Sequence, residues 1–598
     1  MTSRMAGWIF LVALLLVPLA AQADPKDKDK FPFLEATVDK LQAEMAAGRL
    51  TSEKLTRAYI QRIKELDQGD ADSLGVNALI EINPDAIAIA KQMDDKRRKG
   101  QVLGPLHGIP VLLKANIDTG DKMQTTAGSL GLQGTPAKID STVAANLRAG
   151  GAVILGKTNL SEWANFRSFE SVSGWSAVGG QTHNPYGLDR NPCGSSSGSG
   201  AAESANFATL SFGTETDGSI VCPANASGVV GIKPTVGLTS RAGVVPISHT
   251  QDTVGPHGRT VKDAAIALGV IQSRTFDGRD AATGGVPLGW QGVHPRPTNI
   301  PSDYTQFLNP HALQGARLGL VRTAIFFNLN PVPAGFLPTP APVVKAFDDV
   351  VAALKAAGAT VIDLDAAGFT GFAGGGASGE LLVLEFDFRG DVQKYFATRT
   401  GVPLAGGTLQ TGIDFNNNNA DAEMPFFNQD IWLQTASLAP GPDDAQPVFG
   451  GTTYNQALAA DQAFTQGGID AALAQFNLDA VIAPTDNPAW STDLLYGDHF
   501  VFGSSSLGAA GGYPYVQVPA TNVYGIPMGL TFFGTAFSEP TLIKLASGFE
   551  AVTRERAKNP PKLTPTIPDD HIAGEPLKIP RGNSGKTEKP EGWRPHHM

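Results

Sequence analysis

The chain has 598 residues, of which 42% are apolar and 17% are charged, a composition typical of a folded globular protein. The formal net charge at pH 7 is −11 and the sequence has no basic stripe, so we expect no nucleic-acid partner. Neither of the two cysteines has a Cys or His partner at ligand spacing, so we expect no metal and no cofactor.

The N-terminus carries a predicted export signal. Arg4 precedes an apolar run over residues 8–20, and Ala21-Gln22-Ala23 is a small-x-small cleavage site. The apolar run is too short to span a bilayer comfortably. We therefore predict a signal peptide over residues 1–23, cut after Ala23, and a secreted or periplasmic protein with no stable membrane anchoring. An uncleaved anchor is the alternative.

The rest of the chain alternates helical and strand patterns. Residues 38–45 repeat apolar side chains at helical spacing, and Thr51 or Ser52 can cap a second helix. Further expected elements are strands at 109–114, 152–155 and 525–533 and a helix at 540–552. This alternation predicts an α/β sheet with helices on both faces.

Composition changes in two later segments. From 364 to 461, glycine, asparagine and proline clusters interrupt short helical pieces such as 381–386, which predicts a variable cap or insertion over the site. Loops carried on a rigid scaffold are where substrate selectivity usually lies. Residues 558–598 are rich in proline and charge, and we predict a disordered tail there.

Two serine-bearing glycine turns, 194–200 and 217–219, organise the chain. Gly218 allows a close backbone approach to a ligand because it lacks a Cβ. Successive N–H groups around such a turn converge into a nest that suits an oxyanion. Ser219 at this turn is therefore a candidate nucleophile, and it needs a base.

Residues 151–158 match the phosphate-loop pattern G-x4-G-K-T, but the four spacer residues form an apolar strand. A phosphate cradle needs a loop with inward N–H groups. We therefore expect no nucleotide site here.

Residues 194–198 match the G-x-S-x-G nucleophile elbow, which requires an incoming strand. The preceding residues are polar and turn-like. His249 and His257 lie in loop-like segments with no evident acidic partner. A Ser-His-Asp hydrolase is thus a secondary hypothesis.

Cys193 and Cys222 flank the two turns. Export permits a disulfide between them. Buried packing of two free thiols fits the sequence equally well, so the pairing stays open.

Several blocks taken together resemble the amidase signature hydrolases; they lie at 104–118, 151–166, 192–202, 213–224, 228–238 and 511–534. The resemblance implies one large domain over residues 31–557. The implied fold is a large, mixed, twisted central sheet flanked by helices on both faces, with the 364–461 insertion.

The resemblance also implies a Ser–cis-Ser–Lys triad. It assigns Ser219 as the nucleophile, Ser195 as the bridging serine and Lys114 as the base. It further implies that the backbone N–H groups of Thr216, Asp217, Gly218 and Ser219 form an oxyanion hole.

Elementary chemistry is consistent with these roles. A free lysine has a pKa near ~10.4, so desolvation must lower it for the amine to act as a base near pH 7. Two positions depart from the family pattern: Asp217 replaces a glycine and Ala115 replaces an aspartate. If position 217 required a positive φ, Asp would tolerate it better than most residues.

Among family members, the blocks NLSEWANFRS and ETDGSIVCPA look most like bacterial peptide amidases, which hydrolyse C-terminal carboxamides of peptides and release ammonia. We therefore predict an amidase acting through an acyl-enzyme on a peptide or small-molecule amide. The alternatives are an amidase or esterase for aliphatic, aryl or fatty substrates, an amidotransferase subunit, which the export signal disfavours, and a non-catalytic binding protein. The oligomeric state stays open.

Overall fold

The computed structural model describes residues 31–69, 74–284, 296–325, 327, 338–373, 379–438 and 451–566. The chain divides into two units, Met1–Leu34 and Glu35–Met598, and the elements named below belong to the second. The predicted signal peptide 1–23 lies outside the described residues, as do residues 374–378 and 439–450 of the predicted insertion and residues 567–598 of the predicted tail.

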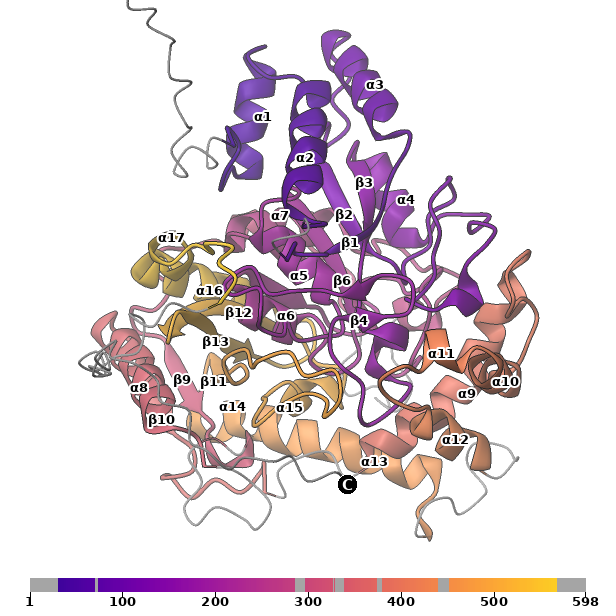
Figure 1. The fold of residues 1–598 in the computed structure, drawn as a ribbon. Coiled ribbons are helices and arrows are strands. Elements are labelled where there is room, and N and C mark those ends of the chain that lie inside the picture. The colour runs from indigo at the N-terminus through magenta and orange to yellow at the C-terminus, as the bar shows by residue number, and fades with distance from the viewer. Residues whose placement is uncertain are drawn as a thin grey trace, which may run out of the picture. The chain divides into compact units, whose positions relative to one another are not determined.

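Within the described ranges, eleven strands form one mixed sheet in the order β1-β3-β2-β6-β8-β7-β12-β13-β11-β9-β10 (Figure 1). Their bounds are β1 Leu79–Ile82, β2 Pro110–Lys114, β3 Val153–Thr158, β6 Leu210–Glu215, β7 Val230–Lys233, β8 Thr253–Gly258, β9 Arg317–Leu320, β10 Thr360–Asp363, β11 Ala480–Pro484, β12 Tyr515–Val523 and β13 Ile526–Phe533. Strand β2 runs parallel to β3 and β6, and β9 runs parallel to β10 and β11. The other neighbouring pairs are antiparallel. A separate small hairpin pairs β4, Trp175–Ser176, with β5, Gly180–Gln181.

Helices cover both faces of the large sheet, which confirms the predicted α/β class (Figure 1). Helix α5 contacts β6, α7 contacts β8, and α16 contacts β12. The helix bounds are α1 Val38–Ala46, α2 Ser52–Leu66, α3 Ala86–Arg98, α4 Thr142–Ala149, α5 Ser197–Ser204, α6 Val221–Ser227, α7 Val261–Ile271, α8 Ala341–Ala356, α9 Glu380–Thr398, α10 Leu409–Asn418, α11 Ala420–Glu423, α12 Asp430–Ser437, α13 Tyr454–Thr465, α14 Ala471–Phe476, α15 Ser506–Ala509, α16 Glu539–Thr553 and α17 Glu555–Lys558.

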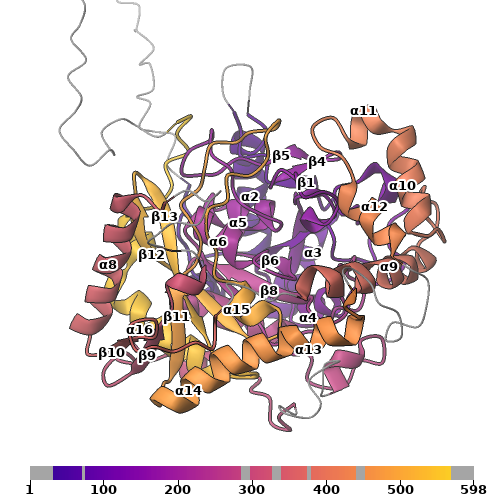
Figure 2. The ribbon, with the colours of Figure 1, turned by 90° about the horizontal axis from the view of Figure 1, so that it is seen from below.

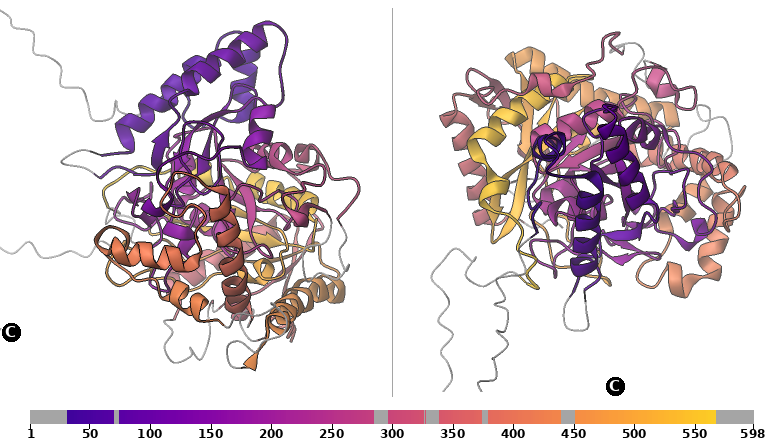
Figure 3. Two further views of the ribbon diagram at one scale, coloured as in Figure 1. Left: turned by 90° about the vertical axis from the view of Figure 1, so that its right-hand side faces the viewer. Right: turned by 90° about the horizontal axis from the view of Figure 1, so that it is seen from above.

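Local signals account for several of these boundaries. Helix α2 begins after Thr51, whose hydroxyl accepts a hydrogen bond from Lys54 N–H. Asp94 of the neighbouring helix α3 accepts the N–H groups of Ser52 and Glu53 at 2.7 and 3.0 Å. The two helices therefore lie side by side, as the indigo and purple ribbons of Figure 3 show.

Two elements are longer than the sequence predicted. The strand expected at 152–155 is β3, which continues to Thr158, and the helical piece expected at 381–386 belongs to the 19-residue helix α9. Helix α9 buries acidic as well as apolar side chains, including Asp387 and Asp391. Its amphipathic pattern is therefore weak, and only tertiary packing defines its length.

An apolar cluster joins helices of the predicted insertion to the short helical segment η3, Glu162–Asn165. The rings of Trp163 and Trp432 lie 4.9 Å apart, and Trp432 Nε1 donates a hydrogen bond of 2.8 Å to Phe166 O. Figures 1 and 2 show helices α9 to α12 grouped on the side of the molecule where β4 lies, and α13 runs from this group towards α14.

A buried ion cluster reinforces this contact. Arg167 donates a hydrogen bond to the Glu162 carboxylate, and both side chains are fully buried. Arg167 also donates to the carbonyl oxygen of Glu423 at 2.5 Å, and its guanidinium lies 4.4 Å from the centre of the Phe427 ring. The helices of the predicted insertion are thus anchored on residues 162–167.

Across the part of the chain that the structure describes, no helix combines the length and the apolar composition needed to cross a membrane.

Helix α5 lies unusually close to the sheet. A Cβ added to Gly198 would lie 2.3 Å from Ala78 O and within 2.7 Å of the Asn159 backbone. We expect Gly198→Ala to lower the free energy of unfolding by about 1–3 kcal/mol, because the added methyl group would force the backbone at Ala78 or Asn159 to move. The exposed Gly390 of α9 has open space around it, so Gly390→Ala is the matched control and should stabilise by up to about 1 kcal/mol. Urea unfolding of both variants tests this, and equal midpoints would contradict the packing argument.

Candidate active site

Lys114 lies at the end of β2, between β3 and β6, and its side chain is fully buried. Its Nζ donates hydrogen bonds to Ser195 Oγ at 2.8 Å and to Thr214 Oγ1 at 2.9 Å. The carbonyl oxygen of Thr214 lies 3.3 Å away. All three neighbours are neutral oxygens.

Burial dominates the ionisation of this amine. Desolvation lowers the pKa of Lys114 to about 7, although the negative charges of Asp252 and Glu215 act in the opposite direction. Close to neutral pH, a large fraction of the Lys114 side chain is therefore unprotonated and able to accept a proton.

Ser195 follows a cis peptide bond with Gly194, directly before helix α5. Its carbonyl oxygen accepts the N–H of Ser161 at 3.1 Å. A Cβ at Gly194 would lie 2.2 Å from Ser161 Oγ, so this position accommodates only glycine without rearrangement.

Ser219 lies in the turn between the end of β6 and the start of α6, and it is 7% exposed. The N–H of Ser196 donates to Ser219 O at 3.0 Å, so the two serine turns are in direct backbone contact. The structure thus joins Lys114 to Ser195 by a side-chain hydrogen bond and Ser219 to the neighbouring residue by a backbone hydrogen bond. Within the described residues, no hydrogen bond links the hydroxyls of Ser195 and Ser219.

The carboxylate of Glu215 organises the Ser219 turn. It accepts the N–H of Gly218 at 2.9 Å, of Ile220 at 2.6 Å and of Val221 at 3.0 Å. The hydroxyl of Tyr515 also donates to it. Burial raises the pKa of Glu215, while these donors hold it down.

This network involves one of the predicted oxyanion donors. The N–H of Gly218 already donates to Glu215, so it does not point freely into the site. Among the described residues, the N–H groups of Thr216, Asp217 and Ser219 have no protein partner and can still serve an oxyanion. Gly218 has φ +79°, whereas Asp217 is not among the residues with positive φ. Asp217 therefore needs no left-handed conformation at this turn.

A disulfide between Cys193 and Cys222 connects the two serine turns covalently. The pairing that the sequence left open is therefore made. In the parts of the chain that the structure describes, no cluster of three or more His, Cys, Asp or Glu side chains is arranged to hold a metal ion.

The structure shows what the phosphate-loop pattern at residues 151–158 forms. Lys157 of the phosphate-loop pattern lies in the buried strand β3, and its Nζ donates to Ile117 O at 2.5 Å. No inward-facing loop exists at those residues.

Neither His249 nor His257 is placed as the base of a Ser-His-Asp triad. His249 has acidic partners that the sequence did not reveal, because Asp391 of α9 lies 2.7 Å from its Nδ1. His257 Nε2 lies 2.9 Å from Ile220 O, and burial lowers the pKa of His257 to about 4, so its imidazole is neutral.

A cavity of about 250 Å³ opens beside the two serine turns. Gly194 and Gly218 line it from the turns, while Trp490 and Phe500 line it from the loop after β11. Its lining comes from the segments 165–222 and 486–506. Sequence reasoning missed the second segment, which has polar loop character and no motif.

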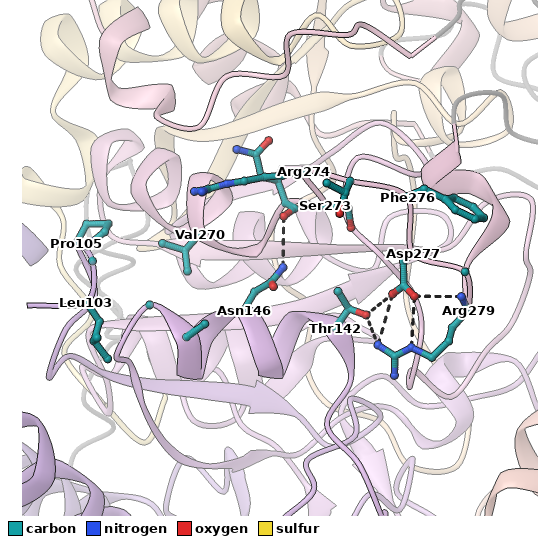
Figure 4. Close-up of a pocket in the computed structure, with 16 residues that line it drawn as sticks. Leu103, Pro105, Thr142, Asn146, Val270, Ser273, Arg274, Phe276, Asp277 and Arg279 are labelled. Carbon is teal, nitrogen blue, oxygen red and sulfur yellow. Dashed lines mark hydrogen bonds and ion pairs between the residues drawn. The ribbon is translucent and has the colours of Figure 1, made fainter.

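Another cavity, of about 540 Å³, lies between α4 and the loop at 272–279 (Figure 4). Polar groups that line this cavity are hydrogen-bonded to one another. Asp277 accepts hydrogen bonds from Thr142 Oγ1 and from the backbone and side chain of Arg279. Although partial burial acts in the opposite direction, these bonds lower the pKa of Asp277 to about 2. No predicted site residue lines this cavity.

The fold and this site define an amidohydrolase. The sequence profile described as Amidase matches residues 54–371, and the chain belongs to the amidase family.

Known relatives agree with this membership. A native peptide amidase from Stenotrophomonas maltophilia is 41% identical, with a TM-score of 0.75 over 89% of this chain and 99% of that one. A peptide amidase solved with the competitive inhibitor chymostatin is 42% identical, with a TM-score of 0.77 over 89% of this chain and all of that one. An Arabidopsis thaliana protein named as an amidase is 37% identical over 93% of this chain and 97% of its own length.

The role of Glu215 as a positioning residue is testable. We expect Glu215→Gln to lower kcat on the order of a hundredfold with little change in KM, because the amide cannot accept all three N–H groups and the Ser219 turn shifts. Tyr515→Phe keeps the carboxylate and all three backbone bonds, so its loss of kcat should be much smaller. Steady-state kinetics on a peptide amide measures both variants, and an unaltered kcat in Glu215→Gln would refute the role.

Proposed function

We propose that this amidase uses Ser219 as the nucleophile, Ser195 as the proton relay and Lys114 as the general base. The observation that carries the proposal is the short contact between Lys114 Nζ and Ser195 Oγ in a fully buried setting. An amine with a pKa of about 7 is matched to proton transfer at neutral pH.

The chemistry follows from these positions. Neutral Lys114 takes a proton from Ser195, which takes one from Ser219 as the Ser219 oxygen attacks the amide carbon. The developing oxyanion is stabilised by the N–H groups of Thr216, Asp217 and Ser219. Protons return through Ser195 to the leaving nitrogen, ammonia departs, and water hydrolyses the Ser219 ester by the same route. A serine hydroxyl both donates and accepts, as a relay requires.

C-terminal amides of peptides are the proposed substrates. The 41–42% identity to peptide amidases over nearly their full length supports this choice. The aromatic residues Trp490 and Phe500 supply apolar surface next to the turns. Small aliphatic, aryl or fatty amides or esters are the alternative substrates for the same triad, and a non-catalytic binding role is the alternative function.

We also propose that the protein is secreted or periplasmic and has its signal removed after Ala23. The disulfide between Cys193 and Cys222 supports an oxidising compartment, because cytosolic thiols are kept reduced. N-terminal sequencing of the exported protein tests the cleavage position.

The triad is tested by substitution. We expect Ser219→Ala to abolish labelling by a fluorophosphonate probe, and Lys114→Ala to lower kcat by a factor on the order of 10³, since the base is lost. Lys157→Ala is the matched control, because Lys157 is also a fully buried strand lysine but does not contact either serine. If kcat falls equally in both lysine variants, the loss is explained by misfolding after removal of a buried lysine and not by removal of the base. An active Lys114→Ala enzyme would falsify the assigned base.

The pH profile provides a separate test. Because unprotonated Lys114 is the active form, kcat/KM should rise about tenfold per pH unit below pH 7 and level off above it. Asp252 raises the pKa of Lys114, so Asp252→Asn should move the midpoint to lower pH. A midpoint that is unchanged, or that moves to higher pH, would contradict the electrostatic argument.

A further inference from the structure

The cavity beside the two serine turns has an acidic lining. Three aspartates contribute to it, Asp217, Asp486 and Asp498, and none of its lining residues is a lysine, arginine or histidine. Asp217 directly precedes Gly218, so the negative charge lies at the nucleophile turn.

Asp486 is a buried carboxyl, and burial together with the negative charges of Glu215 and Asp217 raises its pKa well above the usual value. It is 1% exposed, and neither of its carboxyl oxygens has a hydrogen-bond partner among the described residues. Buried polar groups are almost always paired, because leaving one unpaired costs desolvation without compensation. An unpaired buried carboxyl that lines a substrate cavity indicates a partner that arrives with the ligand.

The other two aspartates are partly paired. Asp217 Oδ2 accepts Ser506 Oγ–H at 2.5 Å, while its Oδ1 has no partner. Asp498 accepts the N–H of Ser173 at 3.1 Å and Asn191 Nδ2–H at 3.2 Å. Burial raises the pKa of Asp498 to about 6, so this carboxyl is largely ionised above neutral pH.

Two aromatic rings complete the wall. Trp490 is 7% exposed and Phe500 is 50% exposed, and their ring centres lie 6.2 Å apart in an edge-to-face arrangement. Aromatic faces attract cations through the ring quadrupole, most strongly where water is excluded. The wall thus combines carboxylates with aromatic rings.

We propose that this cavity selects amide substrates by charge, taking an ammonium or guanidinium group near the scissile amide and rejecting a carboxylate there. This inference rests on the proposed function and names the substrate class of the same site. A cation in the cavity favours the ionised form of Asp486 and donates N–H bonds to the unpaired oxygens of Asp486 and Asp217, while the aromatic rings contact its flat or methylene surface. The same field repels the carboxylate product of hydrolysis and favours its release.

The experiment compares three N-acetylated dipeptide amides that differ only in the C-terminal residue: arginine, citrulline or glutamate. Arginine and citrulline have nearly the same shape and differ in charge. We expect kcat/KM for the arginine amide to exceed that for the citrulline amide by about tenfold or more, and the glutamate amide to be the poorest. Equal values for arginine and citrulline overturn the proposal.

Variants then locate the charge. Asp486→Asn and Asp498→Asn should each reduce the arginine-to-citrulline ratio, and Asp498→Asn remains informative if Asp486→Asn fails to fold. Asp493→Asn is the matched control, because Asp493 lies on the same loop but is not among the lining residues. Its ratio should stay at the wild-type value, and a ratio that falls equally in all three variants would refute the cavity as the source.

The outcomes separate the two proposals. Hydrolysis of all three amides at equal kcat/KM contradicts charge selection while leaving the amidase function intact. Failure to hydrolyse any of the three, together with an unlabelled Ser219, contradicts both.

Discussion

The site depends on the exclusion of water from the amine of Lys114. Strands β3 and β6 enclose the end of β2, so water cannot solvate the Lys114 ammonium, and its neighbours are hydroxyl and carbonyl oxygens. Among the described residues no carboxylate forms an ion pair with Lys114, although Asp252 and Glu215 are near enough to affect its pKa. A direct carboxylate contact would raise the pKa of Lys114 and restore its positive charge. The sheet therefore determines the chemistry as well as the position of the amine.

Several independent interactions fix the two serine turns relative to each other. The backbone bond from Ser196 to Ser219, the disulfide and the Glu215 carboxylate each limit the same two loops. Catalytic rates are sensitive to displacements of about 1 Å, so redundant constraints have a clear value. One of these constraints occupies the N–H group of Gly218, which donates to Glu215.

Some of this arrangement could be predicted from the sequence. Lys114 ends an apolar run and Ser219 lies in a glycine turn, so both have local signals, and the family resemblance supplied Ser195. The resemblance also implied Gly218 as an oxyanion donor, whereas in the structure its N–H donates to the side chain of Glu215, which folds back onto its own turn. The spacing of apolar residues in the sequence does not predict a side-chain-to-backbone hydrogen bond of this kind. The partner of His249 lies 142 positions away in α9, and that separation cannot be read from composition. The cavity wall at 486–506 was missed for the same reason.

Helices α9 to α12 and the serine loops both contact residues 161–167. Trp163 packs on Trp432 of α12, and Arg167 binds the carbonyl oxygen of Glu423, while Ser161, just before them, holds the carbonyl oxygen of Ser195. A chimaera that exchanged α9 to α12 with those of a relative would meet residues 161–167 shaped for a different neighbour. An exchange of these helices would therefore have to include the seven residues 161–167. Sequence variation in α9 to α12 should accordingly be confined to surfaces that do not contact these residues.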